Sequence, residues 1–300
     1  MKILIVGSSG FIGSHLSQYF NKNRYSVKGC DIVPPVSSEV PFFLISPGNN
    51  DFSGLFENES YDICINASGS ASVPLSITNP EDDFRLNVTN VYLLLNKIRK
   101  HQSSCRFLNF SSAAVYGNPS SLPVSEEMLL APLSPYGFHK VLSEHICNEF
   151  YKLYKIETMS LRVFSAFGPG LRKQLFWDLA KKAENAETVE LFGTGKESRD
   201  FIYIDDLVAS VDAVISHSHF VGEPINVSSG NEITVRYAAE TFLNYYKKGA
   251  GLKFSGLGKP GDPLKWRADV SKLKSIGFKA GVSFEDGVKN YCEWLANIRE

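Results

Sequence analysis

Three side chains near the middle of the chain could together transfer a proton. Tyr136 and Lys140 bracket the segment Tyr136-Gly-Phe-His-Lys140, a spacing that places a phenol and an ammonium on one face of a helix. An earlier apolar segment ends in Ser111-Ser112. A positive charge near a phenol favours its ionised form, and a phenolate can take a proton from a substrate hydroxyl while the carbon beneath gives up hydride. We therefore expect Tyr136 to act as acid and base, Lys140 together with a positively charged hydride acceptor to lower the pKa of Tyr136, and Ser112 to orient the substrate hydroxyl.

The same tyrosine–lysine spacing recurs at Tyr151 and Lys155, so spacing alone does not identify the site. Tyr151 is expected deep within a helix, where a surface tyrosine is the ordinary interpretation. Tyr136 is expected at the start of that helix, after a loop that follows the strand ending in Ser111-Ser112. Ligands of open parallel sheets bind at the carboxyl ends of the strands. Position therefore favours Tyr136.

A glycine-rich turn near the start of the chain predicts a dinucleotide site. Gly7, Gly10 and Gly13 directly follow the apolar segment Ile3 to Val6 and open a predicted helix. The first glycine allows a tight turn, the second lets a pyrophosphate approach the backbone, and the third lets the helix pack close to the sheet. Asp31 ends the next predicted strand, where its carboxylate would bind an adenosine ribose and repel a 2′-phosphate, favouring NAD over NADP. A turn cap is the alternative role for Asp31.

The elements that must hold these residues follow the pattern of a parallel sheet covered by helices. The expected strands are Ile3 to Val6, Ser26 to Cys30, Ile63 to Asn66, Arg106 to Phe110 and Thr158 to Val163. The expected helices are Ile12 to Asn21, Asp82 to Lys100 and Tyr136 to Tyr154, and the long loops are Val33 to Asn50 and Asn118 to Pro132. Phe201 to Ile215 is expected to return to the main sheet and continue as a helix behind it. The predicted fold is α/β, a Rossmann-type doubly wound parallel sheet with a smaller C-terminal α/β substrate domain.

The predicted domain boundaries follow a shift toward shorter, glycine-richer elements after Gly168-Pro169-Gly170. Residues 1–165 and 200–221 are expected to form the NAD-binding domain, and residues 166–199 and 222–300 the substrate domain.

Composition excludes several classes of partner. The 300 residues carry 31 Lys plus Arg against 32 Asp plus Glu, a net charge of −1. A nucleic-acid or polybasic membrane surface normally shows as a basic excess, so neither partner is expected. No apolar run is long enough to suggest a membrane span. The five cysteines are odd in number, scattered and never in C-x-x-C spacing, which favours buried thiols in a reducing cytoplasm over disulfides or structural zinc.

Taken together in this order, the motifs resemble the extended short-chain dehydrogenase/reductases, in their nucleotide-sugar epimerase/dehydratase family. The resemblance rests on the G-x-x-G-x-x-G turn, Ile63-Cys-Ile-Asn-Ala-Ser-Gly69, Asn87-Val88, Ser111-Ser-Ala-Ala-Val-Tyr-Gly117, Tyr136 to Lys140, Leu161-Arg-Val-Phe-Ser-Ala-Phe-Gly-Pro169, Phe192-Gly-Thr-Gly195, Arg199-Asp-Phe-Ile-Tyr-Ile-Asp-Asp206, Asn226-Val-Ser-Ser-Gly230, Pro260-Gly-Asp262 and Ala268-Asp269. It runs through nearly the whole chain. It implies bound NAD, a nucleotide-diphosphate sugar as substrate, and a homodimer paired through the two helices expected over Asp82 to Lys100 and Tyr136 to Tyr154.

The resemblance also implies roles for individual positions. Ser112, Tyr136 and Lys140 match the catalytic triad. The implied NAD contacts are Gly7, Gly10, Phe11, Ile12, Gly13, Asp31, Asn66, Ala67, Ser68 and Asn87, together with Tyr136 and Lys140. The implied substrate contacts are Ser112, Ser165, Phe192, Arg199, Lys259 and Asp262, with Arg199 gripping the diphosphate. An ion pair with Asp200 or Asp205 is the alternative role for Arg199.

Three departures from the family pattern bear on the substrate and cofactor. Ser165 stands where asparagine is usual, Lys259 stands where arginine is common, and the usual adenine contact is not clear in Ser46-Pro-Gly-Asn-Asn-Asp51. Ser is shorter than Asn, and Lys binds phosphate only as a point charge.

The residues after Ser112 bear on the reaction. Family members that dehydrate a keto sugar usually carry an acid there, whereas this chain has Ala113-Ala114, as the 4-epimerases do. We therefore expect an NAD-dependent nucleotide-sugar 4-epimerase that works through a transient 4-keto sugar. The alternative enzyme is a reductase of an NDP-4-keto-6-deoxy sugar. A catalytically idle dinucleotide sensor is the alternative outside enzymes, and it commonly lacks the tyrosine or lysine that this chain retains.

Overall fold

The computed structural model describes residues 1–35, 39–46, 48, 51–258 and 263–298. The chain forms two compact units. The first comprises Met1–Gly117, Leu129–Val163 and Val214–Asn226, and the second comprises Asn118–Met128, Phe164–Ala213 and Val227–Glu300. The predicted assignment of residues 1–165 and 200–221 to cofactor binding and of the rest to substrate binding stays a prediction.

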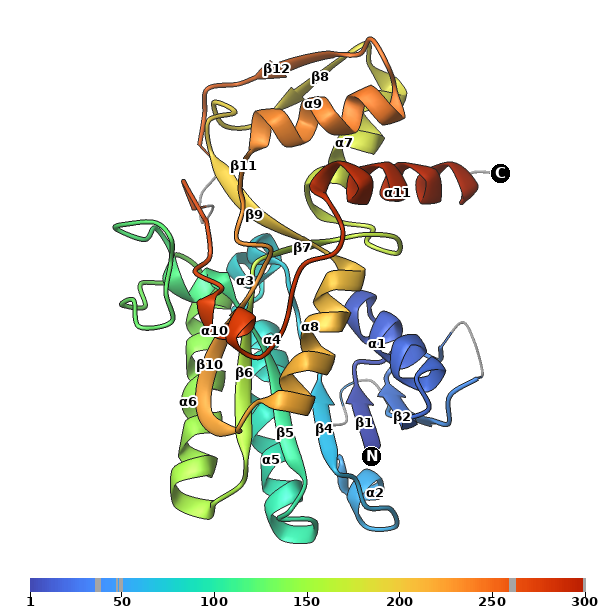
Figure 1. Cartoon of the computed structure of the whole chain (residues 1–300), viewed down its shortest axis with the longest axis vertical. Coiled ribbons are helices and arrows are strands. Elements are labelled where there is room, and N and C mark those ends of the chain that lie inside the picture. The colour runs from blue at the N-terminus through green and yellow to red at the C-terminus, as the bar shows by residue number, and fades with distance from the viewer. Residues whose placement is uncertain (36–38, 47, 49–50, 259–262, 299–300) are drawn as a thin grey trace. The chain divides into compact units, whose positions relative to one another are not determined.

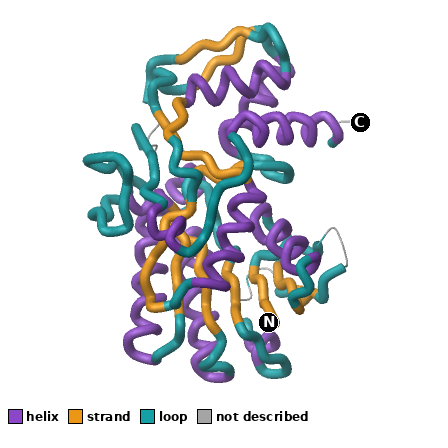
Figure 2. Tube along the Cα trace, in the orientation of Figure 1, coloured by secondary structure: helices purple, strands orange, loops and turns teal. Residues whose placement is uncertain are grey.

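The first unit is built around a seven-stranded sheet with helices on its faces (Figure 1 and Figure 2). Its strand order is β10-β6-β5-β4-β1-β2-β3. The strands are β1 (Lys2–Val6), β2 (Ser26–Asp31), β3 (Phe42–Leu44), β4 (Ile63–Asn66), β5 (Arg106–Ser112), β6 (Thr158–Val163) and β10 (Val221–Val227). The strands from β1 to β6 pair in parallel, with Ile5 of β1 opposite Gly29 of β2 and Ile65 of β4. The predicted doubly wound parallel fold is confirmed.

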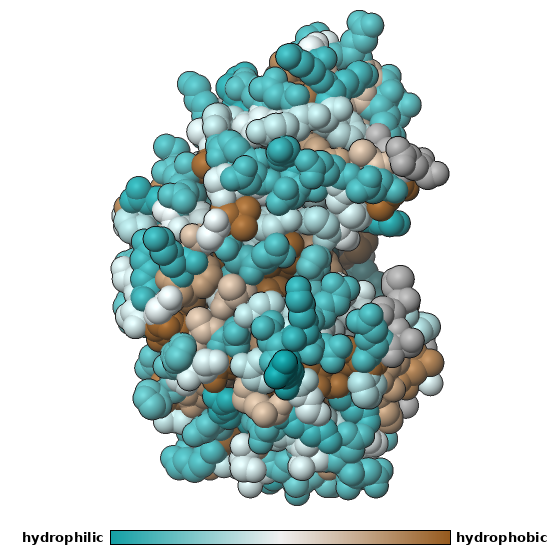
Figure 3. All heavy atoms as spheres, turned by 45° about the vertical axis from the view of Figure 1, so that its right-hand side comes forward, coloured by the Kyte–Doolittle hydropathy of each residue, from teal (hydrophilic) through white to brown (hydrophobic). Residues whose placement is uncertain are grey.

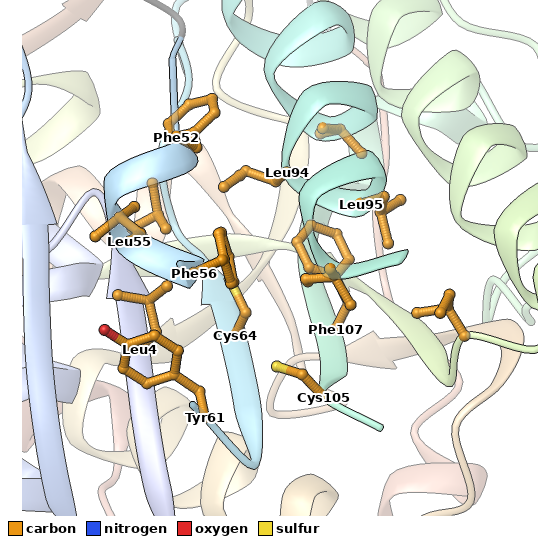
Figure 4. Close-up of a cluster of buried hydrophobic side chains, with 14 of the residues drawn as sticks. Leu4, Phe52, Leu55, Phe56, Tyr61, Cys64, Leu94, Leu95, Cys105 and Phe107 are labelled. Carbon is orange, nitrogen blue, oxygen red and sulfur yellow. The ribbon is translucent and has the colours of Figure 1, made fainter. Parts of the chain in front are cut away.

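The helices of the first unit connect successive strands. They are α1 (Phe11–Lys22), α2 (Ser53–Phe56), α3 (Val73–Thr78), α4 (Pro80–Phe84), α5 (Asn90–His101) and α6 (Pro135–Tyr154). Strands β4 and β6 are buried along their whole length; β4 is apolar up to Asn66, whereas every second residue of β6 is polar or charged. Apolar side chains of α2, α5 and the strands fill the space between them (Figure 4). Leu55, Leu94 and Phe107 are fully buried there, and each contributes about 1.5–3 kcal/mol through removal of its apolar surface from water.

The helix expected over Asp82 to Lys100 is not continuous. Helix α4 ends at Phe84, a π-helical turn covers Arg85–Thr89, and α5 begins at Asn90. A π-turn widens the helix by one residue per turn and often occurs at functional sites. Here it contains Asn87, whose side chain is buried. Apolar periodicity does not distinguish an α-helix from one that contains a single π-turn, so this break could not be predicted from the sequence.

The second unit contains a three-stranded sheet, β11-β9-β7, and a two-stranded sheet, β12-β8. Its elements are β7 (Ser165–Phe167), α7 (Gln174–Asn185), β8 (Thr188–Leu191), β9 (Ser198–Tyr203), α8 (Ile204–His217, of which residues from Val214 on belong to the first unit), β11 (Glu232–Thr234), α9 (Val235–Tyr246), β12 (Gly251–Phe254), α10 (Ser271–Ser275) and α11 (Phe284–Asn297). The expectation that the segment from Phe201 rejoins the main sheet is wrong. Strand β9 pairs with β7 and β11, and β10 instead supplies the last strand of the main sheet. The expected helix after Phe201 is present as α8.

A buried ion pair joins α6 to the strands beneath it. The Arg162 guanidinium on β6 donates to both carboxylate oxygens of Glu144, at 2.8 Å from Nη2 to Oε2 and 3.0 Å from Nε to Oε1. Ser111 on β5 donates to Glu144 Oε1 at 2.5 Å. The remaining Arg162 nitrogen, Nη1, donates to the Tyr116 hydroxyl at 2.9 Å, and that hydroxyl donates to Asn226 Oδ1 at 2.7 Å. The pair therefore connects β5, β6, β10 and α6 through side chains that are almost fully buried.

None of the helices within the described residues is both long and apolar enough to span a membrane. On the face drawn in Figure 3, hydrophilic residues predominate and hydrophobic residues occur in small groups.

Substitution of Arg162 by methionine is expected to lower the free energy of unfolding by about 3–5 kcal/mol, because the Glu144 carboxylate stays buried without its partner. The free energy of unfolding of the double variant Glu144→Met/Arg162→Met is expected to fall less than that of Arg162→Met, since neither charge remains. Urea unfolding followed by circular dichroism measures both. The control is Lys182→Met, which breaks the exposed pair between Lys182 and Asp178 and is expected to cost less than about 1 kcal/mol. An equal loss in the control and in Arg162→Met would contradict the assignment.

Candidate active site

Helix α6 begins directly before the predicted acid–base residue. Ser134 caps the helix, its hydroxyl accepting a hydrogen bond from the Gly137 amide at 3.2 Å, and Pro135 occupies the first turn. These two residues fix the first turn of α6 and with it the position of Tyr136. The helix ends at Tyr154, and Lys155 caps it with a φ of 59°, in the left-handed region. The second tyrosine–lysine pair therefore straddles the end of the helix, and Lys155 is exposed there.

Tyr136, Lys140 and Ser112 come together in the first unit. Tyr136 and Lys140 are 8% and 6% exposed, and the Lys140 ammonium lies 5.7 Å from the centre of the Tyr136 ring. Lys140 Nζ donates to the Phe110 carbonyl at 2.8 Å, which ties the ammonium to the end of β5. The Ser112 side chain interacts with Tyr136, and its hydroxyl also accepts from the Ala114 amide at 3.2 Å. Ser111, by contrast, is occupied by Glu144, so the second serine of the pair is the one available to a substrate.

Burial dominates the protonation of these two groups. It raises the pKa of Tyr136 to about 12; hydrogen bonding to Ser112 lowers that pKa, and the negative charge of Asp83 raises it. Burial lowers the pKa of Lys140 to about 8, while Asp83 and Glu144 raise it. In the chain alone, loss of hydration outweighs the hydrogen bond to Ser112, so the pKa of Tyr136 lies above its usual value. An additional positive charge from a bound ligand is needed to stabilise the phenolate.

The glycine-rich turn has the geometry of a close backbone approach. Gly7 has a φ of 85°, and a Cβ added to it would lie 2.5 Å from the Ser68 nitrogen. A Cβ on Gly13 would lie 2.0 Å from the Gly7 carbonyl oxygen. Helix α1 starts at Phe11 with no side-chain cap, so the amides of its first turn face outward without an intrahelical partner. Such a helix terminus suits a phosphate group.

Asp31 supports this turn. Its carboxylate accepts hydrogen bonds from the Ser9 amide at 2.9 Å and from the Ile32 amide at 2.7 Å. Asp31 therefore makes the contacts expected of a turn cap, its alternative role. The side chain is only half-buried, so a further contact to a ribose is sterically open and stays a prediction.

A row of buried polar side chains connects the turn after β4 to the catalytic helix. The Ser68 hydroxyl donates to Asn66 Oδ1 at 2.6 Å, and Asn66 Nδ2 donates to Asn109 Oδ1 at 3.2 Å. Asn109 Nδ2 donates to the Ser143 hydroxyl at 3.2 Å, which in turn donates to the Lys140 carbonyl at 2.8 Å. This chain of hydrogen bonds fixes the predicted cofactor residues Asn66, Ala67 and Ser68 relative to α6.

Asn87 is the strongest indication that this region accommodates a ligand. Its side chain is 1% exposed, yet neither Oδ1 nor Nδ2 has a hydrogen-bond partner among the described residues. Gly69, with a φ of 114°, lies against it: an added Cβ would be 2.5 Å from Asn87 Oδ1. A buried amide without partners costs about 1–3 kcal/mol, so a polar ligand group that reached it would bind favourably. The residues present fit a dinucleotide.

Of the predicted substrate residues that the structure describes, Ser165, Phe192 and Arg199 fall in the second unit and Ser112 in the first. Ser165 begins β7, and Phe192 is 61% exposed in the turn after β8. Arg199 lies on β9, with its guanidinium 5.6 Å from the centre of the Trp266 ring and Nη1 donating to the Ser198 carbonyl at 2.8 Å. Asp200 is fully buried and accepts hydrogen bonds from Ser228, Ser229 and the amides of Gly230 and Ala268. Lys259 and Asp262 lie outside the described residues.

Several site residues were missed by the sequence analysis. Asn109, Ser143, Glu144, Asp83 and His139 are buried or half-buried polar residues that face the predicted site residues. One signal was readable: Asn109 interrupts the apolar strand Phe107-Leu-Asn-Phe110, where an amide needs a buried partner. Asp83 and His139 contact each other but lie far apart in the sequence, so local spacing does not predict this pair.

The chain matches the model of the NAD-dependent epimerase/dehydratase family over residues 3–228. It belongs to this family. An uncharacterised UDP-glucose epimerase of Bacillus subtilis is 30% identical to it over 99% of both chains, and a putative UDP-glucose 4-epimerase of Methanocaldococcus jannaschii is 27% identical over 98% of both. The crystal structure of UDP-glucuronic acid 4-epimerase from Bacillus cereus is similar at 28% identity, with a TM-score of 0.90 over 99% of this chain and 100% of that one.

Membership of the NAD-dependent epimerase/dehydratase family confirms the predicted resemblance and identifies an NAD-dependent enzyme. The individual site residues stay predictions that rest on the geometry above. The described residues contain no group of His, Cys, Asp and Glu side chains suited to a metal ion. All five cysteines are free and buried, and burial raises the pKa of Cys30, Cys105, Cys147 and Cys292 to about 12.

Gly13→Ala is expected to weaken NAD binding by at least tenfold, because the new Cβ would collide with the Gly7 carbonyl and displace the phosphate-binding turn. Isothermal titration calorimetry with NAD measures the loss. The matched control is Gly258→Ala, whose Cβ would meet no atom within 4 Å and which is expected to bind NAD as the parent does. Unchanged affinity in Gly13→Ala would place the dinucleotide elsewhere.

Proposed function

We propose that the protein is an NAD-dependent nucleotide-sugar 4-epimerase that works through a transient 4-keto sugar. The observation that carries the proposal is the buried Tyr136–Lys140 pair beside Ser112. Ser112 is followed in the sequence by two alanines, Ala113 and Ala114. The family relatives point the same way: those named above are UDP-sugar 4-epimerases by name.

The chain's own residues provide the acid–base half of this reaction. Ser112 orients the sugar 4-hydroxyl, and the Tyr136 phenolate takes its proton. Lys140, fixed to the Phe110 carbonyl, holds a positive charge near the Tyr136 ring and stabilises the phenolate. NAD⁺, when bound, would supply a positive charge near the tyrosine, accept hydride from C4 and give the same hydride back to the opposite face of the keto sugar. As C4 regains that hydride, Tyr136 returns its proton to the oxygen, and the sugar leaves with the opposite configuration at C4.

The residues after Ser112 disfavour dehydration. Ala113 is fully buried, and Ala113 and Ala114 begin the 3₁₀ turn Ala113–Tyr116. Neither methyl group can transfer a proton, whereas 4,6-dehydration needs further acid–base groups beside the keto sugar. Epimerisation and simple reduction need only the Ser112, Tyr136 and Lys140 set.

The proposed substrate is a nucleotide-diphosphate sugar, with a UDP-sugar as the first choice. The similar Bacillus cereus enzyme was crystallised with UDP-glucuronic acid and NAD. Arg199 is proposed to bind the diphosphate, with Ser165, Phe192, Lys259 and Asp262 as further contacts. The guanidinium of Arg199 presents a planar set of donors suited to phosphate oxygens.

Purified protein incubated with UDP-glucose, UDP-glucuronic acid and UDP-N-acetylglucosamine is expected to convert at least one of them to its 4-epimer, with no net change in absorbance at the reduced-nicotinamide band. Chromatography of the sugars measures the product. Tyr136→Phe is expected to lower turnover at least a thousandfold while NAD affinity stays within about twofold, because the variant loses the hydroxyl that moves the proton but keeps the ring and every other implied NAD contact. Tyr151→Phe, the second tyrosine of the same spacing, is the matched control and is expected to be fully active.

Stoichiometric loss of NADH with an NDP-4-keto-6-deoxy sugar would instead identify the reductase. Full activity of Tyr136→Phe would contradict the proposed acid–base role.

We also propose that the enzyme is a cytoplasmic homodimer paired through α5 and α6. Tyr92 on α5 and Phe138 and Leu142 on α6 are 44%, 57% and 42% exposed, and Phe138 and Leu142 lie one turn apart on one helix face. A group of exposed apolar side chains on adjacent helices is typical of a subunit interface. Five reduced, buried cysteines are consistent with a reducing compartment.

Leu142→Glu is expected to convert the dimer to a monomer, because a charge would replace an apolar contact at the centre of the proposed interface. Sedimentation velocity at micromolar concentration measures the state. Leu264→Glu, an exposed leucine of the second unit, is the control and is expected to stay dimeric. A parent protein that sediments as a monomer at this concentration would refute the interface.

A further inference from the structure

Next to the catalytic pair lies a second buried pair that the proposed reaction does not use. Asp83 on α4 is 2% exposed, and its Oδ2 lies 2.6 Å from Nδ1 of His139 on α6. His139 sits between Tyr136 and Lys140 in the sequence and is itself only 13% exposed. The other carboxylate oxygen, Asp83 Oδ1, is buried and has no hydrogen-bond partner within the described residues. Within the described part of the chain, the His139 imidazole is thus the side chain that holds this carboxylate.

Two carboxylates act on the Lys140 ammonium, and they differ in how their charge is balanced. Glu144, one helical turn after Lys140, is paired with Arg162, whose guanidinium stays charged at every accessible pH. Asp83 is paired with His139, which has no such fixed charge. The remaining ionisable neighbour, Cys147, is a buried thiol whose pKa burial raises to about 12, so it is neutral. Asp83 is therefore the neighbour whose charge is not cancelled by a permanent cation.

The charge of Asp83 acts on both members of the catalytic pair. It raises the pKa of Lys140, against the lowering by burial, and it also raises the pKa of Tyr136. A negative charge at this place therefore keeps the ammonium protonated and delays ionisation of the phenol. Asp83 raises both pKa values, so removal of its charge is expected to lower the pKa of Tyr136 and the pKa of Lys140.

We propose that Asp83 and His139 are positioning residues that set the charge beside Tyr136 and Lys140, with His139 holding the Asp83 carboxylate in place. A carboxylate only accepts hydrogen bonds, so the Nδ1 atom of His139 donates in this contact. The donor on His139 thus fixes where the charge of Asp83 lies, and that charge favours the ammonium form of Lys140. This inference rests on the proposed catalytic role of Tyr136 and Lys140.

The test measures ionisation of Tyr136 directly, through tyrosinate absorbance of the NAD-loaded protein after subtraction of the Tyr136→Phe spectrum. Asp83→Asn keeps the shape of the side chain and removes its charge, and it is expected to move the midpoint to lower pH by about one unit. The alkaline limit of sugar turnover is expected to move the same way, because Lys140 loses its proton at lower pH. His139→Leu removes the donor and is expected to reproduce the shift. His139→Gln restores a neutral donor and is expected to behave like the parent.

Asp82→Asn is the matched control, one residue away on the same short helix. Asp82 is exposed and bonded to Arg85 and Asn79, so its substitution is expected to leave the midpoint unchanged. An unmoved midpoint in a folded Asp83→Asn variant, or an equal shift in Asp82→Asn, would overturn the inference. A His139→Gln variant that shifts as much as His139→Leu would overturn the role of the donor. If the midpoint shifts as expected while no sugar is epimerised, the pair stands and the proposed function fails.

Discussion

The first unit depends on one buried ion pair, between Glu144 and Arg162. Burial of two opposite charges is tolerated only when nearly every donor and acceptor finds a partner, and here Ser111, Tyr116 and Asn226 complete the set. Because its members come from β5, β6, β10 and α6, the pair fixes α6 relative to the carboxyl ends of the strands. Glu144 stands one turn beyond Lys140 and two turns beyond Tyr136 on the same helix. The position of the proposed catalytic side chains therefore depends on a contact in which they take no part.

The low dielectric that makes this pair costly to break also controls the chemistry above it. Burial raises the pKa of Tyr136 and lowers the pKa of Lys140, so it favours the neutral form of both side chains. Nearby charges then decide how far each moves. Glu144 is balanced by Arg162, Asp83 is held by His139, and Ser112 acts on the phenol by hydrogen bonding. Burial thus has the largest effect on the two pKa values, and Glu144, Asp83 and Ser112 change them further.

The sequence was most informative where function depends on local spacing. The strands of the parallel sheet, the glycine turn and the start of α6 all follow from apolar runs, glycine positions and a Ser-Pro cap, each readable within a few residues. Prediction failed where the deciding contact is distant. The strand from Ser198 joined β7 and β11 instead of the main sheet, and the π-turn at Arg85–Thr89 interrupted a regular apolar period. Spacing reveals the lysine next to Tyr136 but not the degree of burial, so the pKa of Tyr136 beside a bound nicotinamide stays a prediction.

The unpaired amide of Asn87 has a consequence for how long a ligand stays. Its two polar atoms are buried beside Gly69 without partners among the described residues, at a cost of about 1–3 kcal/mol in the free protein. A ligand that pairs with them recovers this free energy only while it remains bound, which slows its departure roughly tenfold to a hundredfold. A 4-epimerase regenerates its NAD⁺ in every cycle and gains nothing from exchanging it. One unsatisfied side chain thus favours a dinucleotide that behaves as a resident group of the enzyme over one that behaves as a second substrate.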